Sequence, residues 1–279
     1  MIPLEDNFTD VLSKAKRGLR LSNSELARRA GVAETDLSSA FSGLVNEIVL
    51  RKLAAGLGLG SDPLIALARQ AWRPNDPGPI PGLDGFTAPH GETSVNAFLV
   101  TDPSSKQAVV FDTSMDARPM VQFATDHRLK IVLILLTHAH IDHVADLDQL
   151  KAKTGAMAWA SEREPVSGAS AFPDGRQFDV GALRISTRRT SGHARGGVTY
   201  VVEGLSRRIA LVGDAIFAGS MGGGSVDYQE ALRTNGTEIM SLPDDSVICP
   251  GHGPLTTVGE ERAHNPFAAS FAVAAKDDS

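Results

Sequence analysis

The sequence feature that most constrains the fold is an aliphatic run that ends in a cluster of histidines and aspartates. IVLILLTHAHIDH occupies residues 131–143. Its apolar part predicts a buried β-strand, and side chains two positions apart in an extended chain face the same way. His138 and His140 can therefore bind one metal ion together, while Asp142 and His143, just past the bend, can turn toward a second position. Histidine with carboxylate suits zinc, iron or manganese.

Three further candidate ligands lie beside small residues later in the chain. They are His193 in SGH, Asp214 in VGD and His252 in PGH, and the last two follow apolar runs. Strand ends on one edge of a sheet are where α/β folds gather ligands and catalysts. The pattern therefore predicts a metal site at a sheet edge. The other histidines are expected to be surface or packing residues: His90, His127 and His264.

The chain divides into two regions with different patterns. Residues 1–73 carry leucines and alanines at helical spacing, and a serine–glutamate capping box at 22–25 predicts a short helix that ends at Gly31. RPNDPGPIPG then places four prolines in ten residues, which neither a helix nor a central strand tolerates. We therefore predict a helical domain over residues 1–73, a linker over 74–82 and a second domain over 83–279.

The second region alternates short β-branched runs with turns and occasional helices, which predicts a layered α/β domain. Helices are expected over residues 117–129 and over 143–155, where Gly155 stops the second one. Strands are expected over eight runs: 96–100, 108–113, 131–138, 156–160, 183–187, 198–202, 208–214 and 246–252.

Composition excludes several classes of protein. The formal net charge is −6, so the chain as a whole is no general polyanion binder. A single cysteine, Cys249, rules out an intramolecular disulfide framework and fits a reducing compartment. The first ten residues, MIPLEDNFTD, lack the basic start and apolar core of a signal peptide, and no apolar run approaches the roughly 20 residues of a spanning helix. We expect a cytoplasmic protein that has no membrane partner.

The order THAHIDH, SGH, GD and PGH resembles the metallo-β-lactamase fold hydrolases, over roughly residues 83–279. FAGSMGG and the segment PGHGPLTTVGEERAHNPF at 250–267 are similar to the short bacterial members of the glyoxalase II branch. The resemblance implies an αββα sandwich, with two facing sheets, helices outside and the metals at one edge. A small all-α domain would precede it.

The resemblance also implies a dinuclear site for two divalent metal ions, with zinc expected first and iron or manganese as alternatives. A hydroxide between the ions would attack the substrate carbonyl, since two cations lower the pKa of bound water and polarise the carbonyl. Asp142 would orient that hydroxide or accept its proton. Seven side chains would hold the ions: His138, His140 and His193 for the first, Asp142, His143 and His252 for the second, and Asp214 for both.

The implied reaction is cleavage of a small-molecule thioester of the S-acylglutathione type. A persulfide dioxygenase, whose single iron would be held by residues matching His138, His193 and Asp214, stays open, as does a lactonase or another ester hydrolase. A regulator that senses a small molecule through this domain is a further alternative. Arg195 and Tyr200, which flank a glycine pair, are candidate substrate contacts.

The N-terminal region resembles the helix-turn-helix of the Cro/repressor type, with DNA contact through residues 22–43. The expected second helix, roughly 34–42, offers Glu34 and Asp36 but none of the arginine, lysine, glutamine or asparagine side chains that read bases and contact phosphates. We therefore expect a helical module that packs on the hydrolase or dimerises it, rather than a sequence-specific DNA-binding domain.

Overall fold

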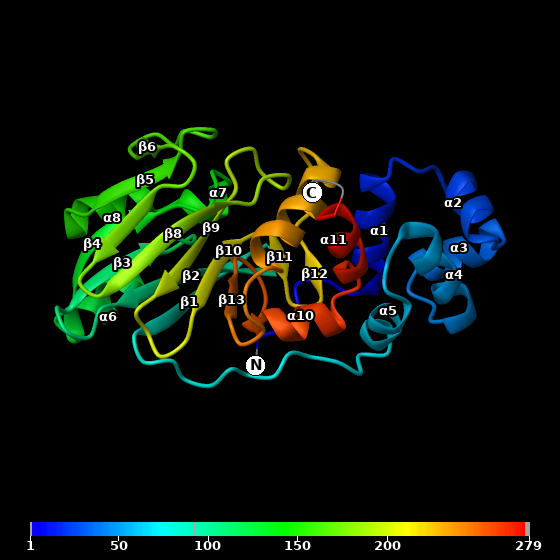
Figure 1. Cartoon of the computed structure of the whole chain (residues 1–279), viewed down its shortest axis with the longest axis horizontal. Helices are drawn as coiled ribbons and strands as arrows, with labels where there is room; N and C mark the ends of the chain where they lie inside the picture. The colour runs from blue at the N-terminus through cyan, green and yellow to red at the C-terminus, as the bar shows by residue number, and fades with distance from the viewer. Residues whose placement is uncertain (1, 92, 277–279) are drawn as a thin grey trace.

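The computed structural model describes residues 2–91 and 93–276, and its centre is a pair of facing β-sheets (Figure 1). Each large sheet has six strands, and a short hairpin of two strands lies beside them. The first sheet runs in the order β1 (Leu83–His90), β2 (Thr93–Thr101), β3 (Gln107–Phe111), β4 (Lys130–Leu135), β5 (Met157–Ser161) and β6 (Ser170–Phe172). The second runs β14 (Thr256–Thr257), β13 (Val247–Pro250), β10 (Ile209–Gly213), β9 (Val198–Glu203), β8 (Leu183–Arg189) and β7 (Gln177–Val180).

Strand direction gives both sheets a shared edge. In the first sheet β3, β4, β5 and β6 are parallel, and in the second β10 and β13 are parallel. The inner faces of the two sheets bury a common core that includes Phe111, Leu135 and Tyr200. Because parallel strands end at the same edge, loops from β3, β4, β10 and β13 come together there.

Helices cover the outer faces of both sheets (Figure 1). The first sheet packs against a cluster of apolar residues from α6 and α8, which includes Met120 and Leu150. The second sheet is covered by helices that follow β12 (Ser220–Met221), the partner of β11 (Ile216–Phe217). The helices of these two layers are α6 (Arg118–Asp126), α8 (Leu147–Thr154), α9 (Tyr228–Thr234) with its π-helical extension η1 (Asn235–Ile239), α10 (Val258–His264) and α11 (Ala268–Ala274). The one-turn helix α7 (Ile141–Val144) lies at the shared edge.

The N-terminal helices lie at the outer end of the second sheet's helical layer (Figure 1). Their apolar side chains join those of β10, α9 and α11 in one continuous core, in which Leu12, Leu53 and Phe271 are buried. Burial of this apolar surface fixes the helices on the sheet. The five helices are α1 (Phe8–Gly18), α2 (Asn23–Ala30), α3 (Glu34–Phe41), α4 (Glu47–Leu57) and α5 (Ser61–Ala68).

The αββα architecture and the eight predicted strands are confirmed. The predicted capping box is also confirmed: Ser22 Oγ accepts from the Glu25 N–H, the Glu25 carboxylate accepts from the Ser22 N–H, and α2 ends at a left-handed Gly31. Residues 71–80, which include most of the proline-rich stretch, have no regular structure.

The helix predicted over 143–155 is wrong as one element, because the chain forms α7 and then α8. At the break Asp146 bonds away from the helix axis: its N–H donates to Thr113 Oγ1, and its carboxylate accepts from the Ala117 N–H. Gly155 ends α8 in the left-handed conformation, as expected.

The division into two domains stays a prediction, and so do dimerisation and DNA contact through residues 22–43. Helices α2 and α3 do follow one another across a short turn, and Glu34 and Asp36 of α3 are exposed. Among the helices of the described residues, none combines the length and the apolar character that crossing a bilayer requires.

Candidate metal centre

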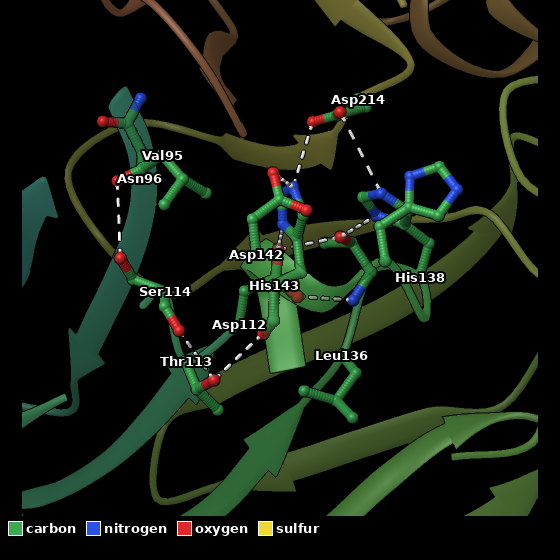
Figure 2. Close-up of polar contacts among 12 residues, drawn as sticks. Val95, Asn96, Asp112, Thr113, Ser114, Leu136, His138, Asp142, His143 and Asp214 are labelled. Carbon is green, nitrogen blue, oxygen red and sulfur yellow. Dashed lines mark hydrogen bonds and ion pairs between the residues drawn. The ribbon is translucent and has the colours of Figure 1, made fainter. Parts of the chain in front are cut away.

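The shared sheet edge brings the predicted ligands together. Figure 2 shows four of them, His138, Asp142, His143 and Asp214. His138 and His140 follow β4, and Asp142 and His143 lie on α7, one turn of helix that the chain enters directly after His140. Three other loops complete the set, from the connection between β8 and β9, from the end of β10 and from the end of β13: His193, Asp214 and His252.

These side chains form two groups, and in each group the potential ligand atoms lie within 4.8 Å of one another. The first group is His138, His140, His193 and Asp214, and the second group is Asp142, His143 and His252. The pairing of His138 with His140 agrees with the two-residue spacing of an extended chain. Their role as ligands stays a prediction.

Asp214 lies between the two groups. Its Oδ2 atom is 3.5 Å from His193 Nε2 in the first group and 3.4 Å from His252 Nε2 in the second. Its Oδ1 atom is 3.2 Å from His143 Nε2. A carboxylate in this position can share its two oxygens between two cations, which is the arrangement that the resemblance implies.

Protein hydrogen bonds hold the Nδ1 atoms of the buried histidines and leave their Nε2 atoms facing the groups. His193 Nδ1 donates to the Gly223 carbonyl at 3.0 Å, and His252 Nδ1 donates to the Ser94 carbonyl at 2.7 Å. A carbonyl can only accept, so Nδ1 of each ring carries a proton and Nε2 is the nitrogen that faces the groups, where His193 Nε2 lies 3.1 Å from His140 Nδ1.

Asp112 fixes one histidine of each group. Its Oδ2 atom accepts from His143 Nδ1 at 2.8 Å and from the Thr137 hydroxyl at 2.8 Å. Since that hydroxyl donates to Asp112, it accepts from His138 Nδ1, 3.0 Å away. Sequence reasoning missed Asp112, although it lies near the end of the strand predicted over 108–113 and directly follows β3, which is parallel to β4. Its position at a strand end was the signal that could have identified it.

Unpartnered buried atoms show that these residues fit cations. His138 Nε2, His143 Nε2 and Asp214 Oδ1 are buried and have no hydrogen-bond partner among the described residues. The 3.2 Å approach of the last two atoms does not meet hydrogen-bond geometry. Buried polar atoms are rarely left unsatisfied, and here all three face one centre of histidine and carboxylate donors.

Charge interactions keep the carboxylates ionised. Burial raises the pKa of Asp214, but the charge of His143 outweighs it and holds that pKa well below its ordinary value. Burial holds the pKa of His138 well below its ordinary value. Although burial lowers the pKa of His252, hydrogen bonds to Asp142 and Asp214 raise it to about 10. A cation that takes the place of this proton gains the same carboxylate partners.

Glycines allow the loops to approach this closely. A Cβ atom at Gly251 would lie 2.6 Å from His143 Cε1, and it would overlap Asp214. A Cβ atom at Gly222 would lie 2.9 Å from His193 Nδ1 and would overlap the carbonyl of Asp214. Gly251, the sequence neighbour of His252, and Gly222 are therefore a steric requirement of the centre.

The other predicted residues have different outcomes. The expectation that Tyr200 contacts substrate is corrected, because its side chain is 0% exposed between the sheets and its hydroxyl donates to the Leu136 carbonyl at 2.7 Å. Arg195 is exposed and lines a cavity beside the loop that carries His193, so its role as a substrate contact stays a prediction.

The remaining histidines lie in two kinds of surroundings. His127 stacks on Phe123 and His264 stacks on Trp72, as packing residues do. His90, which was expected to do the same, lies at the rim of the second group, with its Nε2 atom 3.9 Å from Asp142 Oδ2. It comes from the first β-hairpin, and no motif in the sequence connects it to the centre.

Comparison with known proteins gives consistent results for residues 90–252, which match the model of the metallo-beta-lactamase superfamily. The hydroxyacylglutathione hydrolase GloC of Haemophilus influenzae is 28% identical over 197 residues, covering 62% of this chain and 92% of its own. The human mitochondrial persulfide dioxygenase ETHE1 is 30% identical over 182 residues, covering 61% of this chain and 69% of its own.

A solved structure agrees with these relatives. The crystal structure of the BLEG-1 B3 metallo-beta-lactamase superposes with a TM-score of 0.57 and 27% identity, over 66% of this chain and 99% of that one. The region of this chain that the family model matches includes all seven proposed ligands and none of residues 1–89. This chain is a member of the metallo-beta-lactamase superfamily.

Proposed function

We propose that this chain is a hydrolase that uses two divalent metal ions, zinc before iron or manganese, to cleave thioesters of the S-acylglutathione type. The observation that carries the proposal is the meeting of seven histidine and aspartate side chains in two adjoining groups that share Asp214. Both groups have the donor types that zinc and its neighbours bind. A degenerate sensor domain would be expected to lack part of this set.

The chemistry divides between the cations and the protein. Two bound cations would lower the pKa of a bound water molecule and would polarise the substrate carbonyl. Asp142 supplies an ionised carboxylate, since hydrogen bonding to His252 and the charge of His143 outweigh burial and lower its pKa. We assign Asp142 the orientation of the attacking water and the acceptance of its proton. No serine, cysteine or lysine nucleophile is required.

Similarity to relatives supports the substrate class. The Haemophilus relative is named as a hydroxyacylglutathione hydrolase and aligns over 92% of its length. The likeness therefore extends beyond the metal motif to nearly the whole of that enzyme.

A second candidate is a persulfide dioxygenase, which the human relative at 30% identity favours. In that case a single iron would be held by His138, His193 and Asp214, which all belong to the first group. The second group, Asp142 with His143 and His252, would then have no assigned ion. We prefer the hydrolase because the segment GPLTTVGEERAHNPF, residues 253–267, resembles the glyoxalase II branch.

Two assays on one preparation separate the candidates. The purified protein, stripped of metal and reloaded with zinc, manganese or iron(II), is given S-lactoylglutathione while free thiol is followed, and a glutathione persulfide while oxygen is followed. We expect metal-dependent thiol release without oxygen uptake. Oxygen consumption by the iron form, with no thioester cleavage by any form, would overturn the proposal in favour of the dioxygenase.

A further inference from the structure

A cavity of about 690 Å³ lies between the end of α1 and the glycine-rich loop that precedes α9. The proposed chemistry does not use it. Its walls come from two parts of the chain more than 200 residues apart: Lys14, Arg17 and Arg20 on one side, and Gly224, Ser225 and Tyr228 on the other.

The cavity adjoins the metal centre through the glycine-rich loop. The Lys14 ammonium donates to the Met221 carbonyl at 2.8 Å. Two residues further on, the Gly223 carbonyl accepts the bond from His193 Nδ1. Gly223 also lines the cavity, so this residue contacts a proposed ligand and forms the wall of the cavity. The metal centre and the cavity therefore lie on two sides of one loop.

Three cationic side chains and one carboxylate line the cavity. Lys14 is paired with Asp6. The Arg17 side chain bonds only the Ser13 carbonyl, and Arg20 has no carboxylate partner among residues 2–91 and 93–276. The acidic residue of the lining, Asp227, accepts the Glu230 N–H as the cap of α9. Two guanidinium groups without carboxylates favour an anionic ligand, and their planar donors match a carboxylate or a phosphate.

Packing between Gly18 and Tyr228 holds the two walls together. A Cβ atom at Gly18 would overlap the Tyr228 ring, so the ring lies directly on the backbone of α1. The Tyr228 hydroxyl is buried without a hydrogen-bond partner in the described part of the chain. A buried hydroxyl in that condition is a donor that a bound group or water can satisfy.

A neighbouring cavity of about 570 Å³ differs in how its arginines are paired. It contains Arg195 on the far side of Val226 and Asp227. Its other arginines are paired: Arg163 with Asp174, and both Arg189 and Arg233 with Glu230. The cavity against α1 is therefore the better anion site.

We propose that the N-terminal helix α1 completes the substrate site, and that Arg17 and Arg20 bind an anionic group at the far end of the thiol carrier. The inference rests on the proposed thioester hydrolysis. It gives the N-terminal helices a role in substrate binding. Either a carboxylate or a phosphate could supply the charge, so the substrates must distinguish them.

The test uses one acyl group on three carriers: glutathione, which has carboxylates; coenzyme A, which has phosphates; and neutral N-acetylcysteamine. The double substitution Arg17→Gln with Arg20→Gln is compared with Arg29→Gln, an exposed arginine on α2. We expect kcat/KM for the preferred anionic carrier to fall about 10- to 100-fold in the double variant, mainly through KM, as loss of charged hydrogen bonds implies. The neutral thioester should be cleaved as by the wild type.

Two results would overturn the inference: unchanged kcat/KM on every carrier, or an equal loss on charged and neutral thioesters. If the wild type cleaves no thioester, the proposed function fails separately. Calorimetric binding of S-methylglutathione and of free coenzyme A then tests the cavity alone. Weaker binding of either compound to the double variant than to Arg29→Gln would support the anion site, and binding that is equal in both variants, or absent, would refute it.

Discussion

At the scale of single residues, the centre depends on how each histidine is held as much as on which residues are present. Asp112 accepts from His143 directly and from His138 through Thr137, so one carboxylate orients a proposed ligand in each group. Such partners fix the tautomer and the direction of the ring. Asp112 itself has a left-handed φ of 59°, a conformation that asparagine and aspartate adopt more readily than other side chains.

The substitution Asp112→Asn therefore removes the carboxylate while the new side chain still tolerates the left-handed backbone conformation. We expect the affinity for metal to fall about 10- to 100-fold, because both histidines lose their anionic partner. Competition with a chromophoric chelator measures this change.

A matched control is available nearby. Asp116→Asn removes a carboxylate that bonds Arg118 at the surface, away from both groups. It should bind metal as the wild type does. Equal affinities in all three proteins would contradict the role given to Asp112.

The sequence identified the seven proposed ligands because each lies in a short motif after a strand or a turn. Asp112 was missed because a lone aspartate after a strand is common, and only the parallel pairing of β3 with β4 brings it to His143. His90 was missed because its place near Asp142 depends on the geometry of the β1–β2 hairpin. Tyr200 was misassigned because neighbouring glycines do not reveal that a strand is buried on both faces.

At the scale of elements, long apolar runs were predictable and short or terminal elements were not. The eight predicted strands all form, since each buries a continuous apolar run. The two-residue strands β11, β12 and β14 have too few residues for a period to show. The break between α7 and α8 follows from tertiary bonds of Asp146, which no local pattern reports.

Helix α10 contains a buried acid, Glu261, which is 0% exposed and accepts from Thr256, Asn265 and the Gly219 N–H. Burial raises its pKa to about 7, against the opposing hydrogen bonds. The folded protein therefore binds this proton more tightly than the unfolded chain does. Its stabilising contribution is complete below the unfolded value of about 4.5 and is lost as the pH rises toward and through 7.

Glu261→Gln should remove this part of the pH dependence. In the wild type this group alone should lower the free energy of unfolding by up to about 1.4 kcal/mol per pH unit as the pH rises from about 4.5 to about 7. Urea titrations of the metal-free protein at pH 5, 6, 7 and 8 measure the slope. Glu260→Gln makes the same charge change on the same helix and should keep the wild-type slope. A Glu261→Gln protein with an unchanged slope would refute the assignment.

At the scale of the whole molecule, the N-terminal helices and the superfamily domain share one core rather than meeting at a thin contact. The sequence separated the two regions because their patterns differ, and it could not show that Leu12 and Phe271 belong to the same cluster. Contacts between distant segments depend on the folded arrangement. This shared core places α1 beside the glycine-rich loop and so makes the second wall of the proposed anion site.

The central claim is that the chain binds two metal ions through seven side chains. Elemental analysis after metal saturation and gel filtration tests it most directly, with wild type and His140→Ala compared. We predict two equivalents per wild-type chain, and one or fewer in the variant with turnover lost. Because His140 is exposed, the circular dichroism of the variant should match the wild type. A single equivalent in the wild type, or two in a folded, active His140→Ala protein, would contradict the claim.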